Sequence, residues 1–291
     1  MPIEVKAKSS PEEKHDFDVN AVIFHKGFIY SGADDGKIIK WDENIKKITE
    51  CQAHPCSIYS LAAIEETIYS CSNDGTVKAW TLDLKEKSTI VENTAVEFWK
   101  LAVSDGILFA GDDKGGIMSI INDKPHAMYE ILEGIKDMQA DGKTLFTGKD
   151  IDITVTTIGD GPKPQFATKK VMQGRAPITL AKDKLIFVDI PATGLLIHEN
   201  NSDGQFKPVT MKPAAHSMII NAVAGQREQS TAETVFYSGS WDKTIKKWKI
   251  ADGKCDILET IDVGLVVNAL MVDPNGRLFG GLADGFVIRV Q

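Results

Sequence analysis

Cysteine and histidine are the side chains best suited to hold a metal ion, and Cys51, His54 and Cys56 lie close together in the sequence. Zinc sites usually combine paired groups, such as two Cys-x-x-Cys segments, into a set of four ligands. Here one cluster occurs, and its spacing does not match such a pair. We therefore predict no metal site and expect a structural role for His54.

Residues that could cradle a phosphate or attack a carbonyl carbon are also sparse. The segment Asp-Gly-Lys-Thr (141–144) resembles the end of a phosphate-binding loop, but that motif needs a glycine where the sequence has Asp137. No Gly-x-Ser-x-Gly segment, typical of serine hydrolases, is present. The sequence therefore predicts no catalytic residue and no cofactor.

Charge and composition disfavour further classes of function. The 291 residues include 41 acidic and 33 basic side chains, and the net charge of −8 makes nucleic acid an unfavourable partner. The first residues lack the apolar core of a signal peptide, and no apolar run approaches the roughly 20 residues of a membrane span. We expect a cytoplasmic or nuclear protein that does not bind membranes and keeps four reduced cysteines, Cys51, Cys56, Cys71 and Cys255.

A repeated segment organises the chain. "IYSGADDGKIIKW" (29–41), "IYSCSNDGTVKAW" (68–80) and "FYSGSWDKTIKKW" (236–248) align without a gap. Each reads as an apolar strand, a serine, a tight corner with an aspartate, an alternating strand and a tryptophan. Four weaker copies keep the same frame. They are "LFAGDDKGGIMSI" (108–120), "LFTGKDIDITVTT" (145–157), "IFVDIPATGLLIH" (186–198) and "LFGGLADGFVIRV" (278–290).

Seven copies at intervals of about 40 residues, all with strand patterns, predict an all-β, seven-bladed β-propeller that forms a single domain. One four-stranded blade cannot bury both faces of its own sheet, whereas blades packed in a ring cover one another. The expected blades cover residues 13–52, 53–92, 93–132, 133–173, 174–214, 215–262, and 263–291 together with 2–8.

Three blades carry the residues by which the chain resembles the WD-repeat family. In that family a histidine, a serine or threonine, an aspartate and a tryptophan form a buried hydrogen-bond network in each blade. The resemblance assigns such a network to His15, Ser31, Asp35 and Trp41, to His54, Ser70, Asp74 and Trp80, and to His216, Ser238, Asp242 and Trp248. The other blades have Ile120, Thr157, His198 and Val290 at the expected tryptophan position.

The two ends of the chain are expected to close the ring. The C-terminal segment supplies three strands of the last blade, so a fourth strand is missing there. The segment "PIEVKAK" (2–8) alternates apolar and polar residues before the first blade. We expect it to be the outer strand of the last blade, because pairing the first and last segments leaves no open face.

In WD-repeat proteins, partners commonly bind the face that bears the corner turns and the loops before each first strand. One set of positions projecting there follows the first apolar residue of each inner strand, and comprises Asn20, Tyr59, Trp99, Lys136, Thr179, Asn221 and Asn268. The other set immediately precedes each corner, and comprises Asp34, Asn73, Asp113, Asp150, Pro191, Trp241 and Ala283.

Two tryptophans have no place in the predicted networks. Trp99 and Trp241 both fall on the expected binding face, and exposed tryptophan is a frequent anchor in protein interfaces. The alternative is that Trp99 packs into the channel and Trp241 against a neighbouring loop. Acidic residues nearby favour a partner that presents lysine or arginine beside an apolar side chain. They are Asp18, Asp34, Asp113 and Asp150.

These features favour a non-enzymatic scaffold that docks a protein or peptide partner, itself a monomer within a larger complex. The alternative is a small-ligand binder or an enzyme that uses the central channel. An RNA-binding propeller is disfavoured by the net charge. Because fold alone does not decide function, the partner and the pathway stay open.

Overall fold

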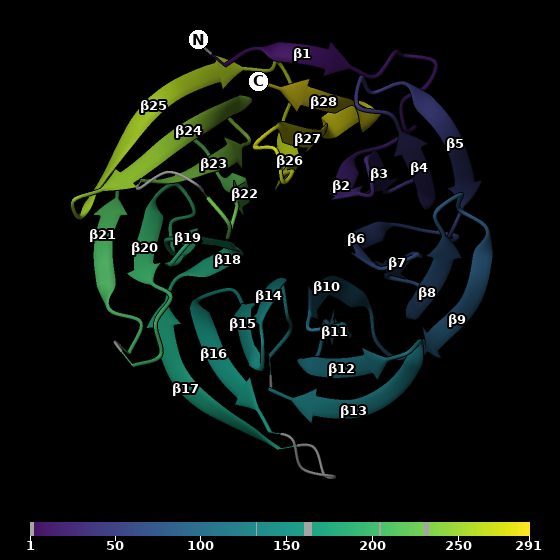
Figure 1. The fold of residues 1–291 in the computed structure, drawn as a ribbon, viewed down its shortest axis with the longest axis horizontal. Helices are drawn as coiled ribbons and strands as arrows, with labels where there is room; N and C mark the ends of the chain where they lie inside the picture. The colour runs from purple at the N-terminus through teal and green to yellow at the C-terminus, as the bar shows by residue number, and fades with distance from the viewer. Residues whose placement is uncertain (1–2, 132, 160–164, 204, 230–232) are drawn as a thin grey trace.

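The computed structural model describes residues 3–131, 133–159, 165–203, 205–229 and 233–291. Seven antiparallel four-stranded sheets stand side by side in a closed ring (Figure 1). The predicted all-β, seven-bladed propeller is therefore confirmed. The described part contains one 3-10 turn, η1 (Ala283–Gly285), and no helix with the length and apolarity needed to cross a membrane.

In each sheet the strands follow one another from the centre outward. The innermost strands are β2 (Val19–His25), β6 (Ile58–Ile64), β10 (Phe98–Ser104), β14 (Asp137–Asp141), β18 (Arg175–Ala181), β22 (Ile220–Gly225) and β26 (Val267–Val272). The second strands are β3 (Phe28–Ala33), β7 (Thr67–Ser72), β11 (Ile107–Asp112), β15 (Thr144–Gly148), β19 (Lys184–Val188), β23 (Thr234–Ser240) and β27 (Leu278–Leu282).

The third strands are β4 (Lys37–Trp41), β8 (Thr76–Thr81), β12 (Gly116–Ile121), β16 (Asp152–Ile158), β20 (Leu195–Glu199), β24 (Thr244–Ala251) and β28 (Val287–Val290). The outermost strands are β5 (Lys47–Gln52), β9 (Glu86–Glu92), β13 (Lys124–Glu130), β17 (Phe166–Gln173), β21 (Pro208–Lys212), β25 (Lys254–Asp262) and β1 (Val5–Lys8). We number the blades 1 to 7 from β2 to β26.

The N-terminal segment closes the ring as predicted. Strand β1 pairs antiparallel with β28, so blade 7 takes its outer strand from the other end of the chain. Glu4 and Gln291 exchange two backbone hydrogen bonds, and Ser9 bonds to Val287 through both its backbone N–H and its hydroxyl. Pro2, the first residue of the predicted segment, lies outside the described residues.

The core lies between the blades. Each apolar cluster combines residues of two neighbouring sheets. Trp41 of blade 1 packs in one cluster with Phe279 of blade 7, and Ile38 of blade 1 packs in the next with Ile58 of blade 2. A sheet in this arrangement is buried on both faces, which explains why the residues of the second strands are almost continuously buried. Glycine permits the close approach of blades at Gly32, where an added Cβ would lie 2.7 Å from the Ile58 side chain.

The register corrects the repeat frame in two blades. In blade 4, Leu145 pairs with Thr156, and in blade 5, Ile186 pairs with Ile197. These pairs are equivalent to Ile29 with Trp41 in blade 1. The residues expected at the tryptophan position, Thr157 and His198, therefore lie one residue too far along the chain. The corners of blades 4 and 5 are one residue shorter than that of blade 1, and an alignment without gaps does not allow for this difference.

Candidate functional site

Blades 1, 2 and 6 bring the predicted histidine, serine, aspartate and tryptophan together. In blade 6, His216 Nδ1 lies 2.9 Å from Asp242 and its Nε2 lies 2.7 Å from Ser238 Oγ, which also accepts from Trp248 Nε1 at 2.8 Å. A proton on Nδ1 satisfies all these contacts, since the ring then donates to the aspartate and accepts from the serine. The network thus links the corner of the blade to its buried tryptophan.

The other two networks have the same geometry. His15 contacts Asp35 at 3.1 Å, and its Nε2 lies 2.7 Å from Ser31 Oγ, which also accepts from Trp41 at 2.7 Å. In blade 2, the corresponding distances from His54 to Asp74 and Ser70 are 2.9 and 2.7 Å. Trp80 donates to Ser70 at 2.9 Å. Because both ring nitrogens of His54 are engaged, the imidazole has no free nitrogen for a metal.

Protonation states support the networks. Burial lowers the pKa of His54 and of His216, and the adjacent aspartates offset only part of that effect. Burial alone would raise the pKa of Asp242, but hydrogen bonds from Thr244 and His216 and the nearby imidazole lower it to about 2. The stable arrangement near neutral pH is therefore a neutral imidazole beside an ionised carboxylate.

β-Bulges place the polar and aromatic residues at the mouth of the channel. The pairing of inner and second strands skips one residue in blades 1, 2, 3, 6 and 7. A bulge leaves a residue unpaired and re-aims its side chain. The residues skipped are Asn20, Tyr59, Trp99, Asn221 and Asn268, all from the predicted mouth set.

Blade 5 departs from this pattern. Its bulge holds two residues, Ala176 and Pro177, between the paired Arg175 and Ile178. Thr179 was expected at the mouth, but it is buried and its hydroxyl accepts a hydrogen bond from the backbone of Gly225. The prediction is wrong in blade 5 because the wider bulge places Ala176 and Pro177, which precede Thr179 in the chain, at the mouth.

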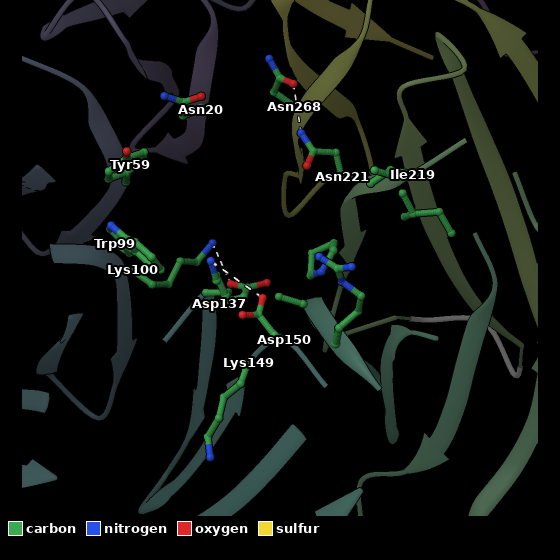
Figure 2. Close-up of a pocket in the computed structure, with 15 residues that line it drawn as sticks. Asn20, Tyr59, Trp99, Lys100, Asp137, Lys149, Asp150, Ile219, Asn221 and Asn268 are labelled. Carbon is green, nitrogen blue, oxygen red and sulfur yellow. Dashed lines mark hydrogen bonds and ion pairs between the residues drawn. The ribbon is translucent and has the colours of Figure 1, made fainter. Parts of the chain in front are cut away.

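The bulged residues border a cavity of about 440 Å³ at the mouth. Figure 2 shows Asn20, Tyr59 and Trp99 facing Asn221 and Asn268 across the opening. Lys136, which precedes β14, also lines this cavity, as does Asp150 from the second predicted set. Trp241, Asp34 and Asp113 do not line it.

One side of the mouth is an aromatic wall. The rings of Tyr59 and Trp99 meet edge to face at 6.3 Å, and Lys136 Nζ lies 4.5 Å from the centre of the Trp99 ring. Trp99 Nε1 donates to Glu97 at 2.9 Å. Burial raises the pKa of Tyr59, and the carboxylates of Glu97 and Asp34 raise it further, so the phenol stays protonated.

On another side of the mouth, hydrogen bonds among asparagine and aspartate side chains hold the amides in place. Asn20 donates to Asp34 at 2.7 Å, and Asn221 donates to Asn268 at 3.0 Å. Asn268 in turn donates to Asp18 at 3.3 Å, and the other Asp18 oxygen accepts from the backbone of Asp284. Asp34 therefore positions the Asn20 amide, and Asp18 positions the amide of Asn268.

An ion pair at the mouth, between the half-buried Lys100 and the buried Asp137, was not predicted. Lys100 Nζ of β10 lies 2.9 Å from Asp137 of β14, which also accepts from the backbone of Ile178 in β18 at 2.7 Å. The contacts join the inner strands of blades 3, 4 and 5. The sequence does carry a signal for this pair. The position after the predicted mouth residue is a small residue in blades 1, 2, 6 and 7, but it is Lys100 in blade 3 and Asp137 in blade 4.

Arg175 also lines the mouth but was not predicted to do so, because the sequence analysis placed the mouth residue of blade 5 at Thr179. Among the cations of the cavity, Lys149 ion-pairs with Glu133 and Asp152, and Lys136 lies 3.8 Å from Asp150. Figure 2 shows Lys149 pointing away from the opening. The guanidinium of Arg175 makes no hydrogen bond or ion pair with any residue that the structure describes.

The cavity is thus more charged than the predicted set. Its charged lining residues all come from blades 3, 4 and 5, and they are Lys100, Lys136, Asp137, Lys149, Asp150 and Arg175. Within the described ranges, no three histidine, cysteine, aspartate or glutamate side chains gather as a metal site would require. The arrangement is suited to hold polar and aromatic groups of a ligand.

A closed seven-bladed ring with histidine–serine–tryptophan networks in three blades defines the class of protein. Residues 207–249 match the family model described as WD domain, G-beta repeat, and residues 5–120 match the model described as IP5P C-F beta-propeller. The chain is therefore a seven-bladed β-propeller that contains repeats of the WD type. No curated protein matches the sequence.

Solved structures share the fold over the whole chain. U3-55K is similar with a TM-score of 0.81 and 14% identity, covering 99% of this chain and 98% of that one. The WD40 propeller of Doa1 has a TM-score of 0.80 and 12% identity over 99% and 96% of the two chains. The WD40 repeats of RRP9 have a TM-score of 0.80 and 13% identity over 100% and 98%. At these identities the likeness shows the fold alone.

Proposed function

We propose that this propeller is a non-catalytic docking platform that holds a protein or peptide partner over the channel mouth. We name the side with the corner turns and the loops before the inner strands the corner face. The observation that carries the proposal is the cavity on that face, where Tyr59 and Trp99 form an aromatic wall and side-chain amides converge. Aromatic anchors beside polar groups are typical of interface hot spots.

Acidic residues add a preference to this proposal. Asp34 and Glu97 lie beside Tyr59, and Asp18 accepts from Asn268 at the bulge of blade 7. A lysine or arginine of the partner would be attracted there, while Asp113 holds the Glu97 backbone in place at 2.8 Å. We infer a monomeric propeller within a larger complex in the cytoplasm or nucleus, with no role for nucleic acid or membrane.

The experiment is affinity capture from native extract, followed by mass spectrometry. We compare the wild type with Trp99→Ala/Trp241→Ala and with the control Ile257→Ala/Leu258→Ala on the outer strand β25, where both side chains are 44% exposed. The wild type and the control should capture the same proteins, and the double tryptophan variant should lose them. Equal capture by all three would overturn the proposal.

The size of the cavity favours a second candidate. A volume of about 440 Å³ lies within the usual range of small-molecule pockets, and the same inner-strand residues continue into the channel. A small-ligand binder or a channel enzyme would gain thermal stability from, or turn over, members of a metabolite panel. The docking proposal expects neither effect.

A further inference from the structure

Apolar side chains on the corner face gather over blades 4, 5 and 6. Among the described residues, four large ones are well exposed there: Ile151, Ile190, Met218 and Trp241, at 60, 47, 48 and 43%. We name these four the apolar arc. On the rest of this face Phe17 alone, among the described residues, is comparably exposed, and the other exposed large apolar side chains lie on outermost strands.

Backbone hydrogen bonds tie the loops of the arc together. Gly174 donates to the carbonyl of Ile151, which joins the corner of blade 4 to the start of blade 5. Ile220 donates to Ala192, and Trp241 donates to Ile219, which continues the connection across blades 5 and 6. The arc is therefore a continuous, ordered surface and not a set of unconnected loop tips.

Arg175 lies within this surface. Its two neighbours in the chain bond to the blade 4 corner, since Gly174 donates to Ile151 at 3.1 Å and Ala176 donates to Lys149 at 3.3 Å. Arg175 lines the mouth cavity together with Ile219 of the loop that carries Met218. A planar guanidinium without a partner, beside exposed apolar groups, is suited to accept a carboxylate in two parallel hydrogen bonds.

We infer that the arc and Arg175 recognise a linear segment of a partner protein in which an aspartate or glutamate adjoins large apolar side chains. The carboxylate pairs with Arg175, and the apolar side chains cover Trp241 and its neighbours. This inference rests on the proposed docking function and specifies one half of its site. The same segment can place a basic residue over the acidic half, near Asp34 and Glu97.

The test selects a phage-displayed library of random linear peptides on the full-length protein. The selected peptides should be rich in aspartate or glutamate beside leucine, isoleucine or aromatic residues. Binding of the corresponding synthetic peptides is then measured by fluorescence polarisation. Arg175→Glu should weaken it about 30-fold, since a charge-assisted hydrogen-bonded contact is worth about 2 kcal/mol. Trp241→Ala should weaken it about tenfold.

Controls separate recognition from folding and from net charge. Lys254→Glu, at the exposed start of β25 on the opposite face, changes the net charge by the same amount and should leave binding unchanged. A peptide with lysine in place of its carboxylate should recover affinity for Arg175→Glu. In methyl spectra, Ile151, Ile190 and Ile219 should shift on peptide addition, whereas Ile48 and Ile257 should not.

The outcomes distinguish this inference from the docking function. If binding survives Arg175→Glu but is lost in Trp99→Ala, the acidic-segment inference is wrong and the docking function stands. If no selected peptide responds to substitution of Arg175, Trp99 or Trp241, both are wrong.

Discussion

The blades with a complete network and those without one contribute differently to the channel mouth. Blades 1, 2 and 6 bury a histidine, a serine and a tryptophan, and they supply no charged residue to the cavity. Blades 3, 4 and 5 lack the network and supply all six charged lining residues. The regular blades thus resemble one another at the mouth, whereas the divergent blades carry its distinctive chemistry.

The divergent blades stabilise their corners by other means. Asp112 in blade 3 accepts from the backbone of Lys114 and Gly116, and Asp189 in blade 5 accepts from Thr193 and Gly194. The tryptophan position is filled by the buried aliphatic side chains of Ile120 in blade 3 and Ile197 in blade 5. Because each blade is held mainly by its neighbours, the ring tolerates the loss of several networks.

The largest expected effect concerns blade 7, which has no network and takes its outer strand from the N-terminus. Deletion of residues 1–9 removes β1 and the contacts of Ser9 with Val287, so the ring is opened at one junction. We expect the melting temperature to fall by about 10 °C or more, since a few kcal/mol corresponds to such a shift in a domain of this size. Calorimetry measures it, and a peptide of residues 3–9 added in trans should restore part of the loss. An unchanged melting temperature would refute ring closure as a source of stability.

A smaller effect contrasts one position in two blades. Ser238→Ala in blade 6 leaves Trp248 Nε1 and His216 Nε2 without their partner, and should cost about 3 kcal/mol of unfolding free energy. At the equivalent position in blade 4, Thr147 makes a long bond of 3.4 Å to the Thr154 carbonyl. Thr147→Val should therefore cost under about 1 kcal/mol. Urea unfolding measures both, and equal losses would remove the distinction between the two kinds of blade.

This contrast also explains how much the sequence could predict. The motif of Ser238, Asp242 and Trp248 repeats with constant spacing, so the ring and the three networks could be located from it. Five mouth residues were located because a one-residue bulge recurs at the same point. Arg175 was not, since blade 5 has a wider bulge, and the Lys100–Asp137 pair depends on contact between blades.

Acid should weaken the networks. The pKa values of His54 and His216 in the folded protein lie below the ordinary 6.5, so the unfolded chain binds more protons once the pH falls below that value. The free energy of unfolding should therefore decrease below about pH 6.5. It should decrease again between about pH 3.8 and 2, where Asp242 is ionised in the folded state alone. Urea midpoints across this range test the sign, and a midpoint that rises on acidification would contradict it.

The smallest expected effect is a gain in stability. Thr156 occupies the tryptophan position of blade 4, and its buried hydroxyl has no hydrogen-bond partner among the residues that the structure describes. Thr156→Val keeps the shape and removes the unpaired group, so the free energy of unfolding should rise by about 1 kcal/mol. Thr76→Val in blade 2 is the matched control, because the Thr76 hydroxyl bonds to Asp74 at 2.6 Å and its removal should destabilise. A loss from both substitutions would show that the blade 4 hydroxyl is satisfied in solution.

Site-specific crosslinking tests most directly whether the divergent blades form the docking site. A photoreactive p-benzoylphenylalanine replaces either Ile190, at the blade 5 corner, or Ile257, on the outer strand of blade 6. Both side chains are well exposed, at 47 and 44%. After irradiation in native extract, the account predicts that the captured partner is crosslinked from position 190 and not from position 257. Crosslinking of that partner from position 257 alone would contradict it.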